Sequence, residues 1–271
     1  MPRMGLRLWK FFASCVIFLL LLHDVSHDCA AAESEGQKEA QEESNDPVIF
    51  VRVLQTKPTY TRIEKGGWQY NQTNRVLLPF AGSLIPGVRL GKTYSITRLE
   101  APILYRSTPQ LSQWGARDFT LFDLMGGDTG FGAAGLGPLV SMPTATNTAF
   151  GTGKWSIGPA AGLTVRSVKG FRFSVLLQQF FSVAGDSSRA TVSTLWLQPN
   201  FAMYFPHALS LITDPIYKFD WTATTATLPV NLQVGKAFNR NLSCALGPEY
   251  IANGPTSGNW SIKGTVNYLN W

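Results

Sequence analysis

Few residues in this chain have the types and spacing that catalysis or cofactor binding requires. Residues 130–135 match the glycine pattern GxGxxG of dinucleotide-binding loops, but that pattern needs a helix after it, and Pro138 would interrupt one. Lys154 follows a glycine but precedes Trp155 instead of the serine or threonine of a phosphate-binding loop. The sequence therefore predicts no cofactor.

Metal and nucleophile chemistry are supported no better. Cys15 and Cys29 lie in the amino-terminal leader, so Cys244 is the one cysteine and His207 the one histidine outside it. These two residues cannot build a multi-ligand metal site or an internal disulfide. The nine carboxylates of residues 47–271 show no spacing that suggests an acid–base dyad. We therefore expect neither a catalytic residue nor a metal site, and we do not expect the protein to be an enzyme.

Charged and polar residues at alternate positions of extended segments are better candidates for function. Arg98 and Glu100 share one face of a predicted strand. Arg166, Arg172 and Gln178 share the polar face of two strands joined by a turn. In a β-barrel such groups line the lumen and influence which solutes pass, or they brace one another inside a filled barrel. Both interpretations remain open.

The elements that would position these residues are clearest in residues 151–189. Apolar residues alternate with small or polar ones from 154 to 166, and the odd-numbered positions from 171 are mostly aromatic or aliphatic. Alternation on both sides of a turn at 167–170 predicts a β-hairpin. Its apolar face packs inside a soluble sandwich or against lipid outside a barrel. In the tight loop that follows, we predict an ion pair between Asp186 and Arg189.

Similar segments continue through the chain and predict an all-β fold. The twelve predicted strands are 48–55, 74–83, 93–105, 117–125, 132–142, 154–166, 171–183, 191–204, 209–216, 225–238, 242–252 and 259–271. The alternation is poor in 117–125. No ten-residue stretch after the leader has a helical period.

The connections between these strands favour a membrane barrel over a soluble sandwich. Those after odd-numbered strands are long (56–73, 106–116, 143–153, 217–224), and most of those after even-numbered strands are short (126–131, 167–170, 205–208, 239–241). Transmembrane barrels have short periplasmic turns and longer outer loops. We therefore predict an antiparallel up-and-down transmembrane β-barrel of about twelve strands over residues 47–271.

The amino terminus has the pattern of a cleaved signal peptide over residues 1–32. Arg3, Arg7 and Lys10 precede a twelve-residue apolar core at 11–22, and small residues at 30–32 suit cleavage. The apolar core would span only about 18 Å as a helix, too short for a membrane anchor. Residues 33–46 contain six acids and one lysine, which predicts a disordered tether.

The charge of the predicted barrel is strongly basic. Residues 47–271 contain 19 basic and 9 acidic residues, whereas the whole chain has a net charge of only +6. A basic domain can bind nucleic acid, but an exported protein would not meet it, so no nucleic-acid partner is expected. The chain ends in Trp271, and a terminal aromatic residue is typical of the strand recognised by the outer-membrane insertion machinery. That machinery and outer-membrane lipid are the expected partners.

An ordered series of short motifs resembles one bacterial family. GGD, MPTAT, GTGKWSIGPAA, FSVAGD, LQP, FDW, LPV and VGK follow one another, starting at residues 126, 142, 151, 181, 197, 219, 228 and 234. Together with residues 74–80 and 97–102, they are similar to the MetA-pathway-of-phenol-degradation family of outer-membrane proteins. The resemblance covers nearly all of residues 48–271. It implies an outer-membrane β-barrel near porin-like and aromatic-uptake channels, without established catalytic residues.

The sequence thus favours an outer-membrane barrel in a Gram-negative-type bacterium that passes small, aromatic or hydrophobic molecules without energy input. A closed structural barrel is the first alternative, with outer loops such as 56–73 binding a partner or lipopolysaccharide. A barrel lipid hydrolase is the second. Its single candidate base, His207, lies in a predicted turn at the periplasmic end, far from the lipid-facing serine that such a hydrolase needs.

Overall fold

The computed structural model describes residues 35–44, 51–63, 66–81, 94–109, 112–254 and 258–270. The predicted signal peptide and the terminal Trp271 lie outside these residues and stay predictions. Within these described ranges, one helix and fifteen strands belong to a single structural unit. Their bounds are α2 Glu35–Glu43, β1 Val53–Ile63, β2 Gly67–Ala81, β3 Tyr94–Ser107, β4 Ser112–Ala116, β5 Phe119–Thr129, β6 Gly132–Met142, β7 Lys154–Val165, β8 Phe171–Gly185, β9 Ser193–Phe205, β10 Leu209–Thr213, β11 Tyr217–Asp220, β12 Thr225–Asn231, β13 Gln233–Ala237, β14 Leu242–Asn253 and β15 Trp260–Leu269.

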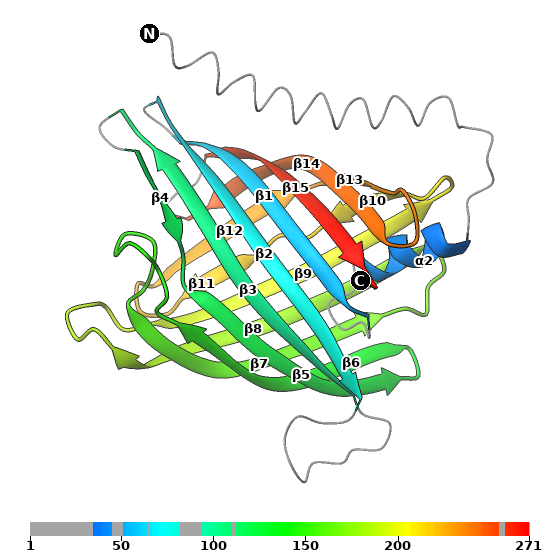
Figure 1. Cartoon of the computed structure of the whole chain (residues 1–271), viewed down its shortest axis with the longest axis horizontal. Coiled ribbons are helices and arrows are strands. Elements are labelled where there is room, and N and C mark those ends of the chain that lie inside the picture. Colours follow the sequence, from blue (N-terminus) through cyan, green and yellow to red (C-terminus); the bar gives the residue numbers. More distant parts are fainter. Residues whose placement is uncertain are drawn as a thin grey trace. The chain divides into compact units, whose positions relative to one another are not determined.

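The strands form one closed antiparallel sheet, as the sequence predicts (Figure 1). Sequential neighbours pair around the wall, and β1 pairs with β15 to close it. β4 leads directly into β5, β10 into β11, and β12 into β13, so each of these pairs occupies one position in the wall. Within the described ranges the fifteen strands therefore fill twelve positions. All twelve predicted strands overlap an observed one, including the poorly alternating segment 117–125.

Side chains outside the wall are predominantly apolar, and polar ones gather inside. On β7, Trp155 and Ile157 are 45% and 48% exposed, whereas Ser156 between them is buried. On β8, Phe171, Phe173, Val175 and Leu177 face outward in the same way. This alternation suits a barrel with lipid outside and a polar lumen. At one end of the wall, Trp68 packs 5.4 Å from Tyr60 and 4.8 Å from Tyr105 between ring centroids, as in an interfacial aromatic girdle.

Three of the predicted long loops contain strand, which corrects the argument from loop length. β1 and β2 occupy most of 56–73, β4 lies in 106–116 and β11 in 217–224. Polarity obscured β1 and β2, because Thr56, Gln72 and Asn74 face outward, in register with exposed Val266 and Ile103. These polar groups bond one another: Gln72 Nε2 donates to Asn74 Oδ1 at 2.9 Å, and Thr56 Oγ1 donates to it at 3.0 Å.

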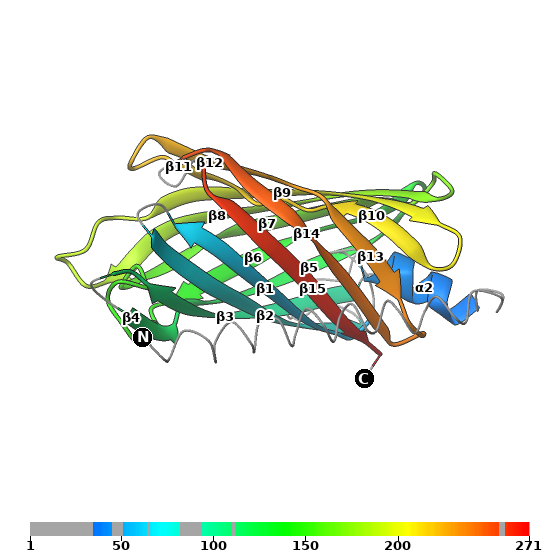
Figure 2. The same cartoon turned by 90° about the horizontal axis from the view of Figure 1, so that it is seen from above.

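The predicted disordered tether is also corrected, because α2 occupies most of it. Glutamate, glutamine, lysine and alanine are good helix formers, but a nine-residue helix is marginal in water without packing. Here Ala40 and Gln41 are buried against the barrel. The helix lies where β1 begins and β15 ends, hereafter the α2 end of the barrel (Figures 1 and 2). No helix among the described residues is long and apolar enough to cross a membrane.

Candidate functional site

The described part of the chain places two compact clusters of buried charge in the lumen. In the first, the carboxylate of Glu100 lies between two guanidinium groups. Arg75 Nε is 3.0 Å from Glu100 Oε1, and Arg98 Nη2 contacts the same oxygen. All three side chains are buried. Arg75 also donates to Gln55 Oε1 at 3.0 Å, and the Arg98 guanidinium lies 5.1 Å from the centroid of the Phe122 ring. One carboxylate therefore balances two cations here.

The second cluster surrounds Asp214, which lies in the break between β10 and β11. Lys57 Nζ donates to its Oδ2 at 2.6 Å, and Lys263 Nζ donates to its Oδ1 at 2.8 Å. Gln233 Nε2 adds a third bond to Oδ1 at 2.7 Å. Lys263 is also 3.6 Å from Glu249 Oε2. Because β15, β14 and β12/β13 lie between β1 and β10/β11 in the wall, the Lys57–Asp214 bond spans part of the lumen.

Asp214 and Lys57 were not singled out from the sequence, although the available signals were simple. Lys57 and Lys263 occupy inward positions of their strands, two residues from inward-facing Gln55 and Thr265. Asp214 precedes Pro215, which has no N–H for the ladder and marks the break in the strand. A charged residue beside a strand-breaking proline is the pattern that could have identified it.

The structure gives the five predicted lumen residues different settings. Arg98, Glu100 and Gln178 are buried on the inner face. Arg172 is also buried and inward, but it binds α2. Arg166 lies just beyond the end of β7, where its Nη1 is 3.3 Å from an Asp128 side chain that is 77% exposed. Arg166 and Arg172 are thus not brought together as one luminal pair.

Asp186 and Arg189, the residues of the predicted loop ion pair, each bond further groups of this loop region. The Arg189 guanidinium donates to the carbonyls of Thr148 at 2.8 Å and Gly151 at 2.5 Å, so it fastens the preceding loop. Asp186 accepts the Ser188 hydroxyl at 2.7 Å and the Ser188 N–H at 2.9 Å. These two bonds stabilise the carboxylate form and hold the pKa of Asp186 below its ordinary value.

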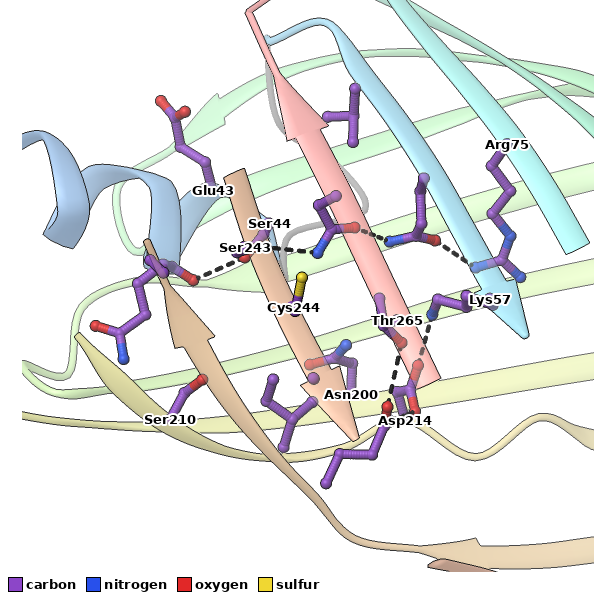
Figure 3. Close-up of a pocket in the computed structure, with 18 of the residues that line it drawn as sticks. Glu43, Ser44, Lys57, Arg75, Asn200, Ser210, Asp214, Ser243, Cys244 and Thr265 are labelled. Carbon is purple, nitrogen blue, oxygen red and sulfur yellow. Dashed lines mark hydrogen bonds and ion pairs between the residues drawn. The ribbon is translucent and has the colours of Figure 1, made fainter. Parts of the chain in front are cut away.

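A cavity lies between the two charge clusters and α2 (Figure 3). Lys57, Arg75 and Asp214 point into it from the wall, and Glu43 and Ser44 line it from the helix side. Carboxamide and hydroxyl groups make up much of the remaining lining. On the opposite side Leu176 belongs both to the cavity lining and to an apolar cluster that fills part of the lumen. That apolar cluster consists of Phe122, Leu124, Leu139, Ala160, Leu176 and Phe180.

α2 closes the cavity at its end of the barrel. Ala40 is fully buried in a group that includes inward-facing Val53, Leu77 and Leu269. Gln37 Nε2 donates to the Phe238 carbonyl at 3.0 Å. These contacts come from several wall positions, so the helix packs inside the rim of the barrel.

Arg172 completes this attachment at the carboxyl end of α2. One guanidinium nitrogen donates to the Glu42 carbonyl, and another lies 3.0 Å from the Glu42 carboxylate. The last carbonyls of a helix have no partner within it, and a glutamate there is unfavourable to the helix dipole. Arg172 offsets both effects. Arg172, which the sequence predicts to line the lumen, therefore stabilises the carboxyl end of a helix that the sequence did not predict.

Comparison with known proteins supports the fold. No family model and no curated protein matches the sequence. Among solved structures, an outer membrane channel from Pseudomonas putida F1 is similar, with a TM-score of 0.59 at 12% identity over 82% of this chain and 96% of that one. The NanC porin follows, with a TM-score of 0.53 at 9% identity over 79% and 98% of the two chains. The protein thus has the twelve-stranded antiparallel fold of an outer-membrane β-barrel.

Proposed function

We propose that this protein is a passive channel of the outer membrane for small molecules. The observation that carries the proposal is the cavity inside a closed barrel, bordered by charged side chains from β1, β2 and β3 and by Asp214. Burying ion pairs contributes little to stability compared with apolar side chains of similar volume. A charged interior is therefore better explained by a polar path for solutes. The fold likeness to a channel and a porin supports this interpretation.

Short turns of transmembrane barrels are periplasmic, and the short turn 205–208 lies at the α2 end, so α2 would close the periplasmic end of the barrel. We expect the full chain to conduct rarely in planar lipid bilayers and a variant lacking residues 35–44 to conduct continuously, because the deletion removes the contacts at Ala40 and Arg172. Silence of both proteins, together with absence of solute flux in proteoliposomes, would remove the channel proposal.

A closed structural barrel is the second candidate, and two observations favour it. The Lys57–Asp214 bond spans part of the lumen, and the apolar cluster fills another part. This candidate predicts no conductance even after deletion of 35–44. In this alternative the outer loops bind a partner or lipopolysaccharide. Because β1 and β2 occupy most of residues 56–73, such a partner would have to contact other loops.

The resemblance to the MetA-pathway family suggests small aromatic or hydrophobic solutes. Phe122, Phe180 and Trp196 support that hypothesis, because their rings lie in or against the apolar cluster. Uptake of a labelled neutral aromatic, such as phenol, into proteoliposomes tests it. Uptake no faster than in empty liposomes would exclude this solute class.

The remaining hypotheses concern hydrolysis and assembly. His207 lies in the turn before β10 with a φ of 63°, at the α2 end. We propose that it has no catalytic role, and unchanged lipid hydrolysis in a His207→Ala variant is the expected result. Recognition of the carboxyl terminus by the insertion machinery stays a prediction, and reduced membrane assembly after deletion of Trp271 would support it.

A further inference from the structure

The lining of the cavity specifies more than its position. Six carboxamides face it, those of Gln41, Gln55, Gln198, Asn200, Gln233 and Asn267. A carboxamide both donates and accepts hydrogen bonds, and so does a hydroxyl group. Small solutes rich in hydroxyl groups can therefore exchange their hydrogen bonds with water for hydrogen bonds with such a surface. A neutral aromatic solute would leave many of these polar groups without partners.

Several buried polar atoms around the cavity lack a hydrogen-bond partner. Among the described residues, Asn200 Oδ1 and Arg98 Nε are buried without a hydrogen-bond partner, and both residues line the cavity. Ser174 lies opposite Asn200 in the β8–β9 register, and its Oγ is also buried without a hydrogen-bond partner. Burying such atoms is costly unless a ligand or water satisfies them.

The unpartnered groups of β8 and β9 lie on one side of the cavity, whereas Arg98 lies on β3, next to β2 and β1 in the wall. Gln198 and Asn200 are two positions apart on β9 and face the same way. On the β1–β15 side, by contrast, Gln55 accepts from Arg75, and Asn267 bonds both Gln55 and Ser243. A solute would thus meet a hydrogen-bonded wall on one side and open polar groups on the other.

The charge balance adds a requirement for the solute. Arg75 and Arg98 share the single carboxylate of Glu100. This cluster keeps an excess positive charge at the cavity, and Arg98 Nε is an unused N–H donor there. An incoming carboxylate would balance that charge and accept from that donor.

We propose that the cavity is a binding site for small hydroxylated carboxylates, the chemical class of hydroxy acids and sugar acids. Arg98 binds the carboxylate, and Gln198 and Asn200 bind hydroxyl groups. The proposal deepens the proposed channel function, because it places the site in the solute path. Binding itself requires no conduction, so the two can fail separately.

The test is calorimetric titration of the full chain in detergent with four probes. Gluconate carries hydroxyls and a carboxylate, sorbitol only hydroxyls, propionate only a carboxylate, and benzoate a carboxylate on an aromatic ring. We expect saturable binding of gluconate and binding about tenfold or more weaker for the other three, since each leaves charged or polar groups unpaired. Equal or tighter binding of benzoate, or no binding of gluconate, overturns the proposal.

A matched pair of variants locates the site. Gln198→Leu removes an inward carboxamide at the cavity, whereas Gln179→Leu removes an outward one on the neighbouring strand. We expect about tenfold weaker gluconate binding for the first and no change for the second. Retained heat-modifiable migration on gels shows that each variant folds. Equal effects of both variants would place binding outside the cavity.

A separate variant tests whether Arg98 binds the carboxylate of the solute. Arg98→Gln should bring gluconate binding down to the level of sorbitol, because the carboxylate loses its partner. Unchanged gluconate preference in a folded Arg98→Gln variant contradicts the assigned role. Gluconate binding without conductance in bilayers would contradict the proposed channel function and support the binding site. Conductance without gluconate binding would support the channel function and contradict the binding site.

Discussion

Asp214 shows how a single residue organises the lumen. Its carboxylate accepts three side-chain bonds, and its N–H donates to Asn231 Oδ1 at 2.9 Å. The break between β10 and β11 leaves this backbone N–H outside the ladder, and the Asn231 side chain satisfies it. The interruption of the strand and the charge cluster are therefore two parts of one local arrangement.

Asp214→Asn should destabilise the barrel strongly, since it leaves Lys57 and Lys263 buried without their shared charge. Loss of one partner from a buried ion pair costs about 3–5 kcal/mol. Urea unfolding in lipid vesicles, followed by tryptophan fluorescence, measures the change. Asp128→Asn is the control, because the exposed Asp128–Arg166 pair contributes at most about 1 kcal/mol. Similar losses in both variants would contradict the central role of Asp214.

The pH response of Asp186 is a second prediction at this scale. Its folded pKa lies below the ordinary value, so the stabilising bonds from Ser188 are present above that ordinary value and are lost as the pH falls through the lowered pKa. Ser188→Ala should raise the pKa of Asp186, measured by NMR titration of its carboxyl carbon, and Ser187→Ala should not. An unchanged pKa in Ser188→Ala would show that the hydroxyl bond does not form in solution, because the variant keeps the bond from the backbone N–H.

The elements differ in how far they could be predicted from the sequence. β6, β7 and β8 alternate because lipid and lumen select opposite side chains at successive positions, and their predicted ranges agree closely with the observed ones. The parts of β1 after residue 55 and of β2 before residue 74 escaped prediction because outward-facing Thr56 and Gln72 are polar and both bond Asn74. α2 escaped because its packing partners Val53, Leu77 and Leu269 are distant in sequence.

The charged residues show the same division. The inward side of Arg98, Glu100 and Arg172 follows from period-two spacing alone. Arg75 lies directly opposite Glu100 in the β2–β3 pairing, so this contact depends on the register of two neighbouring strands. The contact of Arg172 with Glu42 and the cluster around Asp214 depend on which elements come together inside the barrel. Spacing along one strand does not reveal which other strands and helices its side chains contact.

Arg172→Glu should release α2, because two like charges would then face each other at the helix end. We expect a higher open probability in planar bilayers and faster proteolysis of residues 35–44. Glu42→Arg in the same chain restores the opposite charges and should restore closure. Arg166→Glu is the matched control, since Arg166 binds Asp128 and not α2. Equal conductance of the two Arg→Glu variants would show that α2 does not control the mouth.

For the whole molecule, the charged interior serves either stability or solute passage, and one variant separates the two. Replacing Lys57, Asp214 and Lys263 together with Met, Leu and Met removes both buried cations and the carboxylate between them. Glu249 loses its 3.6 Å contact with Lys263 but keeps its 3.0 Å bond from Asn231, and Gln233 loses one acceptor. Such replacements are often neutral or stabilising. We expect unchanged or higher stability and altered ion selectivity in the variant lacking 35–44. A large loss of stability would favour the structural barrel.

The link from Lys57 to Asp214 also has a mechanical consequence. A thin-walled ring flattens easily under lateral pressure, whereas a ring with an internal brace keeps its cross-section. Lys57 and Lys263 join β1 and β15 to the break at Asp214, across the intervening β14 and β12/β13, so they act as such a brace. The barrel should therefore resist ovalisation when membrane tension or lipid thickness changes, and any opening should proceed by motion at its ends and not by dilation of its wall.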